Sequence, residues 1–475
     1  MKRRCVLGVL KTEQGLKIKE EMLKWLSKKY EVIAVEQEAP GNLYELPGLA
    51  MAATTSIMLN EPVLYLHTKG AFYQNNAQPM VRDLWKREFG RDCEHYFAKA
   101  ENAQTAHIPA AIAPLVSRKE HVCWFNGFVF NRLAAEKMLP VLKPHEDRFW
   151  FEGGIERDAG VECFGRYEED ADNSSEAWKK FLGIYEKVVI KGTRFAVVTI
   201  MKHEERYIKE WVEYYRNLGV NHFYVFNNDD EGETGQEQVF NSLNDLAHND
   251  IHQFDCRGRT RLAGMGYQAG IYKWAYETFG EDYDWMLFLD ADEFLNLNGK
   301  TLQEWMSENR HTFAYTSIIK FNWMYYGDNG HVLYEDKPVR ERFRTPCPAD
   351  VKYAQPFPED WYCKPMIRTG LPMCQHIIHS ALISSPHACL SATGKPQNPM
   401  SGQVVPPDFS NGFIEHYGTK SLEEYMEKRC LDIKNAANEQ EYNTDQRLEW
   451  YFNVNEKTPR KEEFIKQFRE THVCR

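Results

Sequence analysis

The sequence has no apolar run long enough to cross a membrane. A spanning helix needs about 20 consecutive, mostly apolar residues, and no stretch of the 475 residues approaches that length. The basic start MKRR leads into CVLGVL, which is shorter than the apolar region of a secretory signal peptide. We therefore read CVLGVL as a first β-strand and expect a cytoplasmic protein without a transmembrane segment. Peripheral association with the inner face of the membrane stays open.

The chain also lacks an excess of positive charge. Its 58 Lys and Arg residues stand against 69 Asp and Glu residues, which gives a formal net charge of −11. A general nucleic-acid-binding protein has the opposite balance, so we expect no nucleic acid among the partners. A local basic cleft for a phosphorylated ligand remains compatible with this net charge.

Cysteine pairs of the C-x-x-C type are absent. The chain has eleven cysteines, an odd number, so reduced thiols are the expected state. One segment gathers four cysteines and three histidines, and a structural zinc ion there is an alternative, although the spacings match no usual zinc knuckle or ribbon. These residues are Cys347, Cys363, Cys374, Cys389, His376, His379 and His387.

Strands and helices alternate in two separate stretches of the chain. The first opens with strand candidates at 4–10 and 31–35 around a helix candidate at 16–29. The second opens with a strand at 194–201 and an amphipathic helix at 203–219. Such alternation indicates α/β domains with mostly parallel sheets. The two halves echo each other, because LYLHTKG takes a place in the first like that of LFLDADE in the second.

A polar stretch separates the two halves. EEDADNSSEAWKK (168–180) is acidic and rich in small residues, and we interpret it as a linker. We predict an α/β domain over 1–180, a catalytic α/β domain over 181–420, and a helical segment over 421–475 packed on the catalytic domain.

An acidic turn follows the most apolar strand of the second half. WMLFL (285–289) leads into Asp290, Asp292 and Glu293. In an open parallel sheet, ligands bind at the carboxyl ends of the strands, and two carboxylates at i and i+2 can reach one hard cation. A Mg²⁺ or Mn²⁺ ion held there would keep positions open for phosphate oxygens and would neutralise a leaving diphosphate. The turn therefore predicts a metal site for a nucleotide.

Four motifs follow one another between residues 194 and 460. They are VVTIMKHEERYIKEWVEYYRNLGVNHFYVFNND (197–229), DWMLFLDADEFL (284–295), FNWMYYGDNGH (321–331) with RERF (340–343), and EHYGTKSLEEYMEK (415–428). In these motifs the second half resembles glycosyltransferase family 92 and, more broadly, the GT-A fold enzymes. The first half has no D-x-D, and its LHTKG and WFNG segments are loosely similar to bacterial polysaccharide-synthesis proteins.

The resemblance implies a reaction and a metal site. The second half would be a GT-A nucleotide-diphospho-sugar transferase with a Rossmann-like sheet. It would move a hexose, with inversion, from a nucleotide-sugar donor, foremost a UDP-sugar, to a glycan acceptor in cell-surface polysaccharide or lipopolysaccharide synthesis. Asp292 would bind Mn²⁺ or Mg²⁺ directly, Asp290 would lie nearer the ribose, and His416 would complete the ligands. His379 and His387 are alternatives to His416.

Further residues are expected around donor and acceptor. A base must take the proton of the acceptor hydroxyl, and Asp328 and Glu341 are the candidates. Lys420 would donate to the leaving diphosphate. Trp323, Tyr325 and Tyr326 are candidate platforms for a sugar ring. The expected donor-binding residues are Thr199, Lys202, Glu204, Asn227, Asn228, Asp229, Gln268, Asp290 and Lys420.

Other classes of function remain open. One is a carbohydrate-binding or assembly protein with an inactive transferase fold. Another is a D-x-D phosphotransferase, although haloacid-dehalogenase-type enzymes place Gly or Thr where this chain has Glu293. The first half is compatible with a metal-free transferase domain, in which His67 or Lys69 meets phosphate, and with an inactive domain that binds acceptor.

Overall fold

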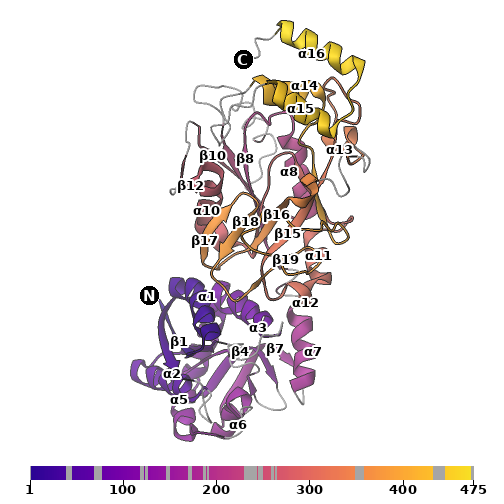
Figure 1. The fold of residues 1–475 in the computed structure, drawn as a ribbon. Coiled ribbons are helices and arrows are strands. Elements are labelled where there is room, and N and C mark those ends of the chain that lie inside the picture. Colours follow the sequence, from indigo (N-terminus) through magenta and orange to yellow (C-terminus); the bar gives the residue numbers. More distant parts are fainter. Residues whose placement is uncertain are drawn as a thin grey trace.

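The computed structural model contains one large sheet in each half of the chain (Figure 1). It describes residues 2–38, 45–68, 77–117, 122–123, 127–145, 150–169, 174–185, 189, 192–228, 243, 250–257, 261–262, 265–347, 358–431 and 444–471. The α/β class predicted for both halves is confirmed by these elements.

The first sheet has the strand order β2-β1-β3-β6-β4-β5, with β7 paired to β4. Strands β1, β2 and β3 run parallel, and β6 runs antiparallel to both β3 and β4. The strands are β1 (Arg3–Leu10), β2 (Tyr30–Gln37), β3 (Val63–His67), β4 (Ala110–Ser117), β5 (Val122–Cys123), β6 (Phe128–Phe130) and β7 (Glu162–Glu169). The helices are α1 (Glu13–Lys29), α2 (Leu46–Leu59), α3 (Ala77–Trp85), α4 (Cys93–Thr105), α5 (Arg132–Met138), α6 (Ile155–Ala159) and α7 (Ser174–Tyr185).

The second sheet begins with a parallel block in the order β10-β9-β8-β13. It continues through β16, antiparallel to β13, and then through β15, β20 and β14, with β19 paired to β15. The strands are β8 (Phe195–Met201), β9 (His222–Asn227), β10 (Ile251–Asp255), β13 (Trp285–Phe288), β14 (Glu293–Asn296), β15 (Thr316–Tyr325), β16 (Cys363–Arg368), β19 (Ala388–Ser391) and β20 (Phe413–His416). The hairpins β11 (Arg261–Leu262)–β12 (Met265–Gly266) and β17 (Met373–Ile377)–β18 (Ser380–Ile383) lie outside it.

Helices pack on this sheet through the apolar faces that their sequences predict. α8 (Ile208–Leu218) buries Trp211, Val212 and Tyr215 and ends at Gly219, whose φ of +103° suits a glycine. α10 (Tyr267–Phe279) follows directly after β12. The other helices of this half are α11 (Leu302–Glu308), α12 (Arg310–Phe313), α13 (Val339–Arg342), α14 (Leu422–Tyr425), α15 (Thr444–Val454) and α16 (Pro459–Thr471). The last three gather at the end remote from the first half (Figure 1).

The strands β3 and β13, which carry the two similar sequence segments, occupy equivalent places in the two sheets. β3 lies between the parallel strand β1 and the antiparallel strand β6. β13 lies in the same way between β8 and β16. LYLHT (64–68) and LFLDADE (287–293) therefore lie at matching positions in two similarly ordered sheets. Lys69, the other phosphate candidate of the first half, lies outside the described residues.

The halves share a hydrophobic core. One cluster of buried side chains includes Leu64 and Trp85 from the first half together with Trp285 and Leu287 from the second. The predicted linker contains the end of β7 and the first turns of α7, whose Trp178 and Phe181 rings stack at 4.8 Å. The stretch is therefore not a plain linker. Its acidic, polar composition did not indicate the amphipathic helix that begins within it. The domain bounds themselves stay a prediction.

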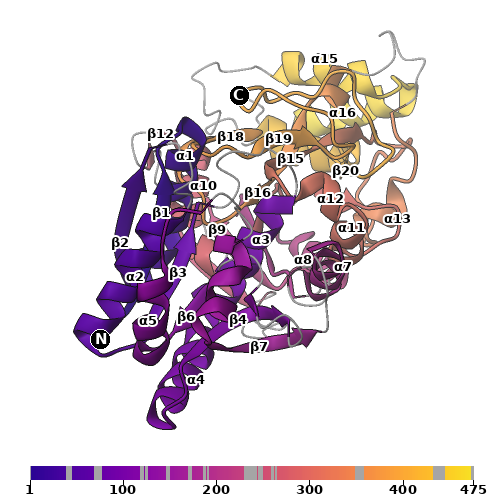
Figure 2. The same cartoon turned by 90° about the horizontal axis from the view of Figure 1, so that it is seen from below.

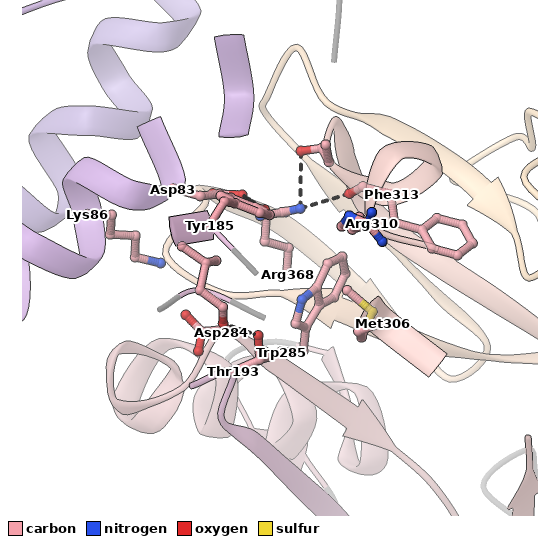
Figure 3. Close-up of a pocket in the computed structure, with 12 residues that line it drawn as sticks. Asp83, Lys86, Tyr185, Thr193, Asp284, Trp285, Met306, Arg310, Phe313 and Arg368 are labelled. Atoms are coloured by element: carbon pink, nitrogen blue, oxygen red, sulfur yellow. Dashed lines mark hydrogen bonds and ion pairs between the residues drawn. The ribbon is translucent and has the colours of Figure 1, made fainter. Parts of the chain in front are cut away.

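Charged side chains of the first half contact the ends of β13 and β16. Arg368, the last residue of β16, donates to both carboxylate oxygens of Asp83 at 2.9 and 2.8 Å. Asp284, just before β13, accepts from Arg87 at 2.9 Å and from Arg91 at 3.2 Å. A cavity of about 30 Å³ lies among these groups (Figure 3). Figure 2 shows the first half covering one end of the second.

Candidate functional site

The acidic turn lies at the carboxyl end of β13, as the sequence predicts. All four residues of β13 are buried, and β14 begins directly after the turn, at Glu293. The side chain of Asp290 keeps 33% of its surface exposed, whereas that of Glu293 keeps none. The side chain of Asp290 is therefore partly open to solvent, and that of Glu293 is buried beneath the turn.

Lys364, on the neighbouring strand β16, neutralises Asp290. Its fully buried Nζ lies 2.8 Å from Asp290 Oδ2 and 3.5 Å from Glu293 Oε2. Gln268 and Tyr272 of α10 donate to Asp290 Oδ1 at 2.9 and 3.3 Å. Burial opposes ionisation, but the charge of Lys364 keeps the pKa of Asp290 below its usual value. Sequence reasoning missed Lys364, which lies 74 residues from its partner.

Glu293 is a supporting residue of the turn. Its Oε2 accepts from the backbone N–H of Asp290 at 2.9 Å. Burial raises the pKa of Glu293 well above its usual range. It braces the turn rather than lining a pocket.

Asp292 faces a histidine and a lysine. Its Oδ1 lies 3.8 Å from His416 Nε2, and its Oδ2 lies 3.7 Å from Lys428 Nζ. The pairing of β14 with β20 sets Glu293 opposite His416, which explains how two distant motifs meet. Burial opposes ionisation of Asp292, but the nearby charges of Lys428 and Lys420 bring its pKa well below the usual value.

The chemistry and spacing of Asp292 and His416 are compatible with two ligands of one divalent ion. Burial lowers the pKa of His416 to about 4, so its imidazole is neutral and able to bind a metal. Its Nδ1 has no hydrogen-bond partner among the described residues. The 3.8 Å gap between Nε2 and the carboxylate is too long for a hydrogen bond and suits two ligands of one ion.

The oxygens of Asp290 are engaged by Lys364, Gln268 and Tyr272, and its part in a metal site stays a prediction. In the part of the chain that the structure describes, no group of three or more His, Cys, Asp or Glu residues could hold a metal ion. This finding includes the described residues of the segment considered for zinc. His387 lies against Tyr315 and Glu21 at the junction of the halves.

Glu204 links two lysines beside Asp292. It follows β8, is buried, and forms an ion pair with Lys428. Its Oε2 lies 3.8 Å from Lys420 Nζ, which stands over the ring of Tyr207 at 4.3 Å. Burial lowers the pKa of Lys420. Lys428 was not singled out in the sequence, although it is the last residue of the EHYGTKSLEEYMEK motif.

The other expected donor-binding residues gather at the ends of β8 and β9. Thr199 is fully buried on β8, and Lys202 follows that strand. The pairing of Met201 with Asn227 brings the two strand ends together, and the Asn228 N–H donates to the Met201 carbonyl at 2.9 Å. Asp229 lies outside the described residues.

The two base candidates have different surroundings. Asp328 is buried, and its carboxylate binds the Gly330 N–H at 2.8 Å, Lys461 Nζ at 2.5 Å and the Tyr451 hydroxyl. These contacts tie the end of β15 to α15 and α16. Glu341 is exposed on α13.

The three candidate platforms differ in exposure. Trp323 is half-buried, and its ring lies 4.1 Å from that of His416. Tyr325 is buried, and its ring centroid lies 4.9 Å from that of His416. Tyr326 is buried, and its ring packs against that of Tyr417. Only Trp323 of the three offers a surface to a ligand.

The chain is similar in sequence to plant glycosyltransferases over part of its length. It is 26% identical over 115 residues to a glycosyltransferase family 92 protein of Oryza sativa subsp. japonica. It is 27% identical over 115 residues to another family 92 protein, from Ricinus communis. Each match covers 24% of this chain and 18% or 19% of the relative, less than a fifth of its length. These matches confirm the resemblance to family 92; no family model matches the chain.

Solved structures show only distant likeness. Glucosyl-3-phosphoglycerate synthase of Mycobacterium tuberculosis, in complex with Mn²⁺, UDP and phosphoglyceric acid, is 15% identical with a TM-score of 0.21 over 30% of this chain and 47% of its own. TarS of S. aureus, in complex with UDP, is 16% identical with a TM-score of 0.20 over 30% of this chain and 38% of its own. Scores this low carry no argument about the present chain.

None of the described helices is both long and apolar enough to pass from one side of a membrane to the other.

Proposed function

We propose that the second half of the protein is a glycosyltransferase. It would move a sugar from a nucleoside-diphosphate donor, a UDP-sugar first of all, to a hydroxyl group of a glycan. The observation that carries the proposal is the gathering of Asp292, His416, Lys420 and Lys428 at the carboxyl end of β13. The partial similarity to two proteins named for glycosyltransferase family 92 supports it.

Asp292 and His416 would hold a divalent cation, Mn²⁺ or Mg²⁺. When bound, this ion would offset the charge of a departing diphosphate. The chain supplies further positive charge through Lys428 and Lys420, whose ammonium groups can donate to phosphate oxygens. Burial lowers the pKa of Lys420, and an arriving phosphate would favour the charged form of its ammonium group.

The acceptor hydroxyl must lose its proton to a base. Asp328 is held by Lys461 and Tyr451, and Glu341 is exposed, so both remain sequence-based candidates only. We add Asp360, whose Oδ1 accepts from the Tyr325 N–H at 2.9 Å, beside the ring that contacts His416. Burial raises the pKa of Asp360 to about 6, near the value that suits a base at neutral pH. A single carboxylate base implies inversion at the anomeric carbon.

The proposal is tested by donor binding to the full chain. UDP, GDP and CMP are titrated calorimetrically with and without Mn²⁺ into the wild type, Asp292→Asn and the exposed control Asp336→Asn. We expect UDP binding that Mn²⁺ strengthens, and a loss of roughly 10- to 100-fold in Asp292→Asn only.

Each alternative gives another result. A binding protein with an inactive fold would bind glycan without any nucleotide, and a phosphotransferase would not distinguish UDP from the other nucleotides. Nucleotide binding that is equal in both variants would remove Asp292 from the site. Extension of a cell-surface polysaccharide or lipopolysaccharide is the reaction that we propose for the active enzyme.

A further inference from the structure

A hollow of about 610 Å³ opens beside the acidic turn. It lies between the start of α10 and the β17–β18 hairpin, elements that run side by side in Figure 1. Its volume is in the range of about 300 to 1,000 Å³ that is usual for small-molecule sites. The lining includes Ala269, Gln375, His376, Ile378 and His379.

Aromatic rings connect the hollow to the proposed metal ligands. The His379 ring, on the wall of the hollow, lies 5.2 Å from the Trp323 ring. The Trp323 ring lies 4.1 Å from the ring of His416. Tyr362, which is 37% exposed, packs at 5.5 Å from Trp323 and 5.4 Å from His379. A ligand in the hollow would thus meet a continuous aromatic surface that leads toward Asp292.

The described lining carries no formal charge. Its residues are glycine, alanine, glutamine, histidine and isoleucine. Burial lowers the pKa of His376 to about 3 and that of His379 to about 4, so both rings are neutral. Lys420 and Lys428 lie instead around Glu204 and Asp292. Lys273 lies nearer, but its Nζ donates to the Cys374 carbonyl at 3.3 Å and is not part of the described lining. The site therefore divides into a cationic part for phosphate and a neutral part for an uncharged ligand.

Polar groups near the aromatic surface can bind hydroxyl groups. His379 Nδ1 donates to the Cys363 carbonyl at 3.0 Å, which leaves Nε2 as an acceptor. Gln375, exposed on the lining, adds an amide group that can both donate and accept. Flat rings, an amide and a neutral imidazole acceptor match the apolar faces and hydroxyl rims of neutral sugars.

We propose that this hollow binds the acceptor as a neutral oligosaccharide, with its terminal sugar stacked on Trp323. The proposal rests on the proposed transferase function and names the acceptor class for that site. An acidic or phosphorylated glycan would find no cation in the described lining of the hollow and is therefore disfavoured.

The test uses the full chain and defined tetrasaccharides. Cellotetraose, maltotetraose and β-1,4-galactotetraose serve as neutral probes, and tetragalacturonate serves as the acidic probe. Binding is measured by saturation-transfer NMR and by titration, with UDP and Mn²⁺ titrated in parallel. The variants are Ile378→Asp, at a side chain that is 39% exposed in the hollow, and Trp323→Ala. The matched control is Met58→Asp, at a 77% exposed apolar side chain on α2.

We expect at least one neutral tetrasaccharide to bind the wild type and the control. Ile378→Asp should weaken that binding by about tenfold or more, because the new carboxylate is desolvated against the sugar, with UDP affinity unchanged. Trp323→Ala should have a similar effect. Equal binding by Ile378→Asp, preference for tetragalacturonate, or binding of no probe would overturn the proposal. Failure of the wild type to bind UDP would instead overturn the proposed function.

Discussion

Lys364 holds a positive charge at a position with no exposed side-chain surface. Such a charge is tolerated because Asp290 and Glu293 surround it. Lys364→Met should therefore leave Asp290 as a partly buried, unpaired carboxylate. We expect a loss of about 3 kcal/mol in the free energy of unfolding, the lower end for a broken buried pair, since Asp290 keeps some exposure. Urea denaturation measures it.

The matched control is Lys395→Met. Lys395 pairs with Asp408 at 2.9 Å, but its side chain is 63% exposed. Breaking this surface pair should cost less than about 1 kcal/mol. Similar losses in the two variants would show that Lys364 and Asp290 contribute no more than a surface pair.

Asp360 provides a pH-dependent prediction. Its pKa is raised to about 6 by burial, above the value of about 3.9 for an unfolded chain. The folded state therefore binds this proton more tightly, and stability is fullest below about pH 4 and falls as the pH rises through about 6. Asp360→Asn keeps an oxygen for the Tyr325 N–H and should gain about 1 to 2 kcal/mol at pH 7.5, after allowance for partial solvation, but nothing at pH 4.

Denaturation of both proteins at pH 4 and pH 7.5 measures this gain. If Asp360 is also the base, the stabilised variant should have lost transfer activity while still binding UDP. A variant with full activity would leave Asp328 and Glu341 as the candidates.

The start of α14 fixes the segment that carries Lys420. Ser421 caps this helix in a capping box with Glu424, and Glu424 also accepts from Arg342 at 2.6 and 2.9 Å. Burial opposes ionisation of Glu424, but its hydrogen bonds to Arg342 and Ser421 bring the pKa to about 2. Glu424→Gln should cost about 3 to 5 kcal/mol, because the Arg342 guanidinium stays buried without a counter-charge.

Thermal and urea unfolding of Glu424→Gln measures this cost. Glu423→Gln, one residue earlier and outside the Arg342 pair, is the control and should change stability much less. Equal losses would mean that the helix start, rather than the ion pair, is what the substitution disturbs.

Sequence patterns predicted elements whose information is local. α8 was predictable because Trp211, Val212 and Tyr215 recur at helical spacing, and the strand before Asp290 was predictable because it is wholly apolar. Asp292 and His416 were identified from motifs, and the β14–β20 pairing brings them together. Lys364 was not predictable, since a lysine inside an apolar strand shows no sign of a partner 74 residues away.

Over the whole molecule, the continuous core predicts that the halves do not fold apart. A fragment of residues 181–475 would expose the apolar surface that packs against Leu64 and Trp85. It would also leave Arg368 and Asp284 without Asp83, Arg87 and Arg91. We expect this fragment to be insoluble, or to be unfolded as judged by circular dichroism. The restart of the strand–helix pattern in the sequence, taken alone, suggested instead that the second half folds without the first. A folded, UDP-binding fragment would show that the shared core is dispensable.

The contact between the halves also bears on how such a chain can change over generations. Side chains of the first half bind Asp284 and Arg368, which lie at one end of β13 and β16. The same two strands carry Asp290 and Lys364 at their other end. A recombination event near residue 180 would join the second half to a first half that has not evolved with it. The contacts at one end of β13 and β16 would then change, and the strands that carry the acidic turn would shift. We therefore expect the two halves to be inherited together, and substitutions at Asp83 or Arg87 to be followed by compensating ones at Arg368 or Asp284.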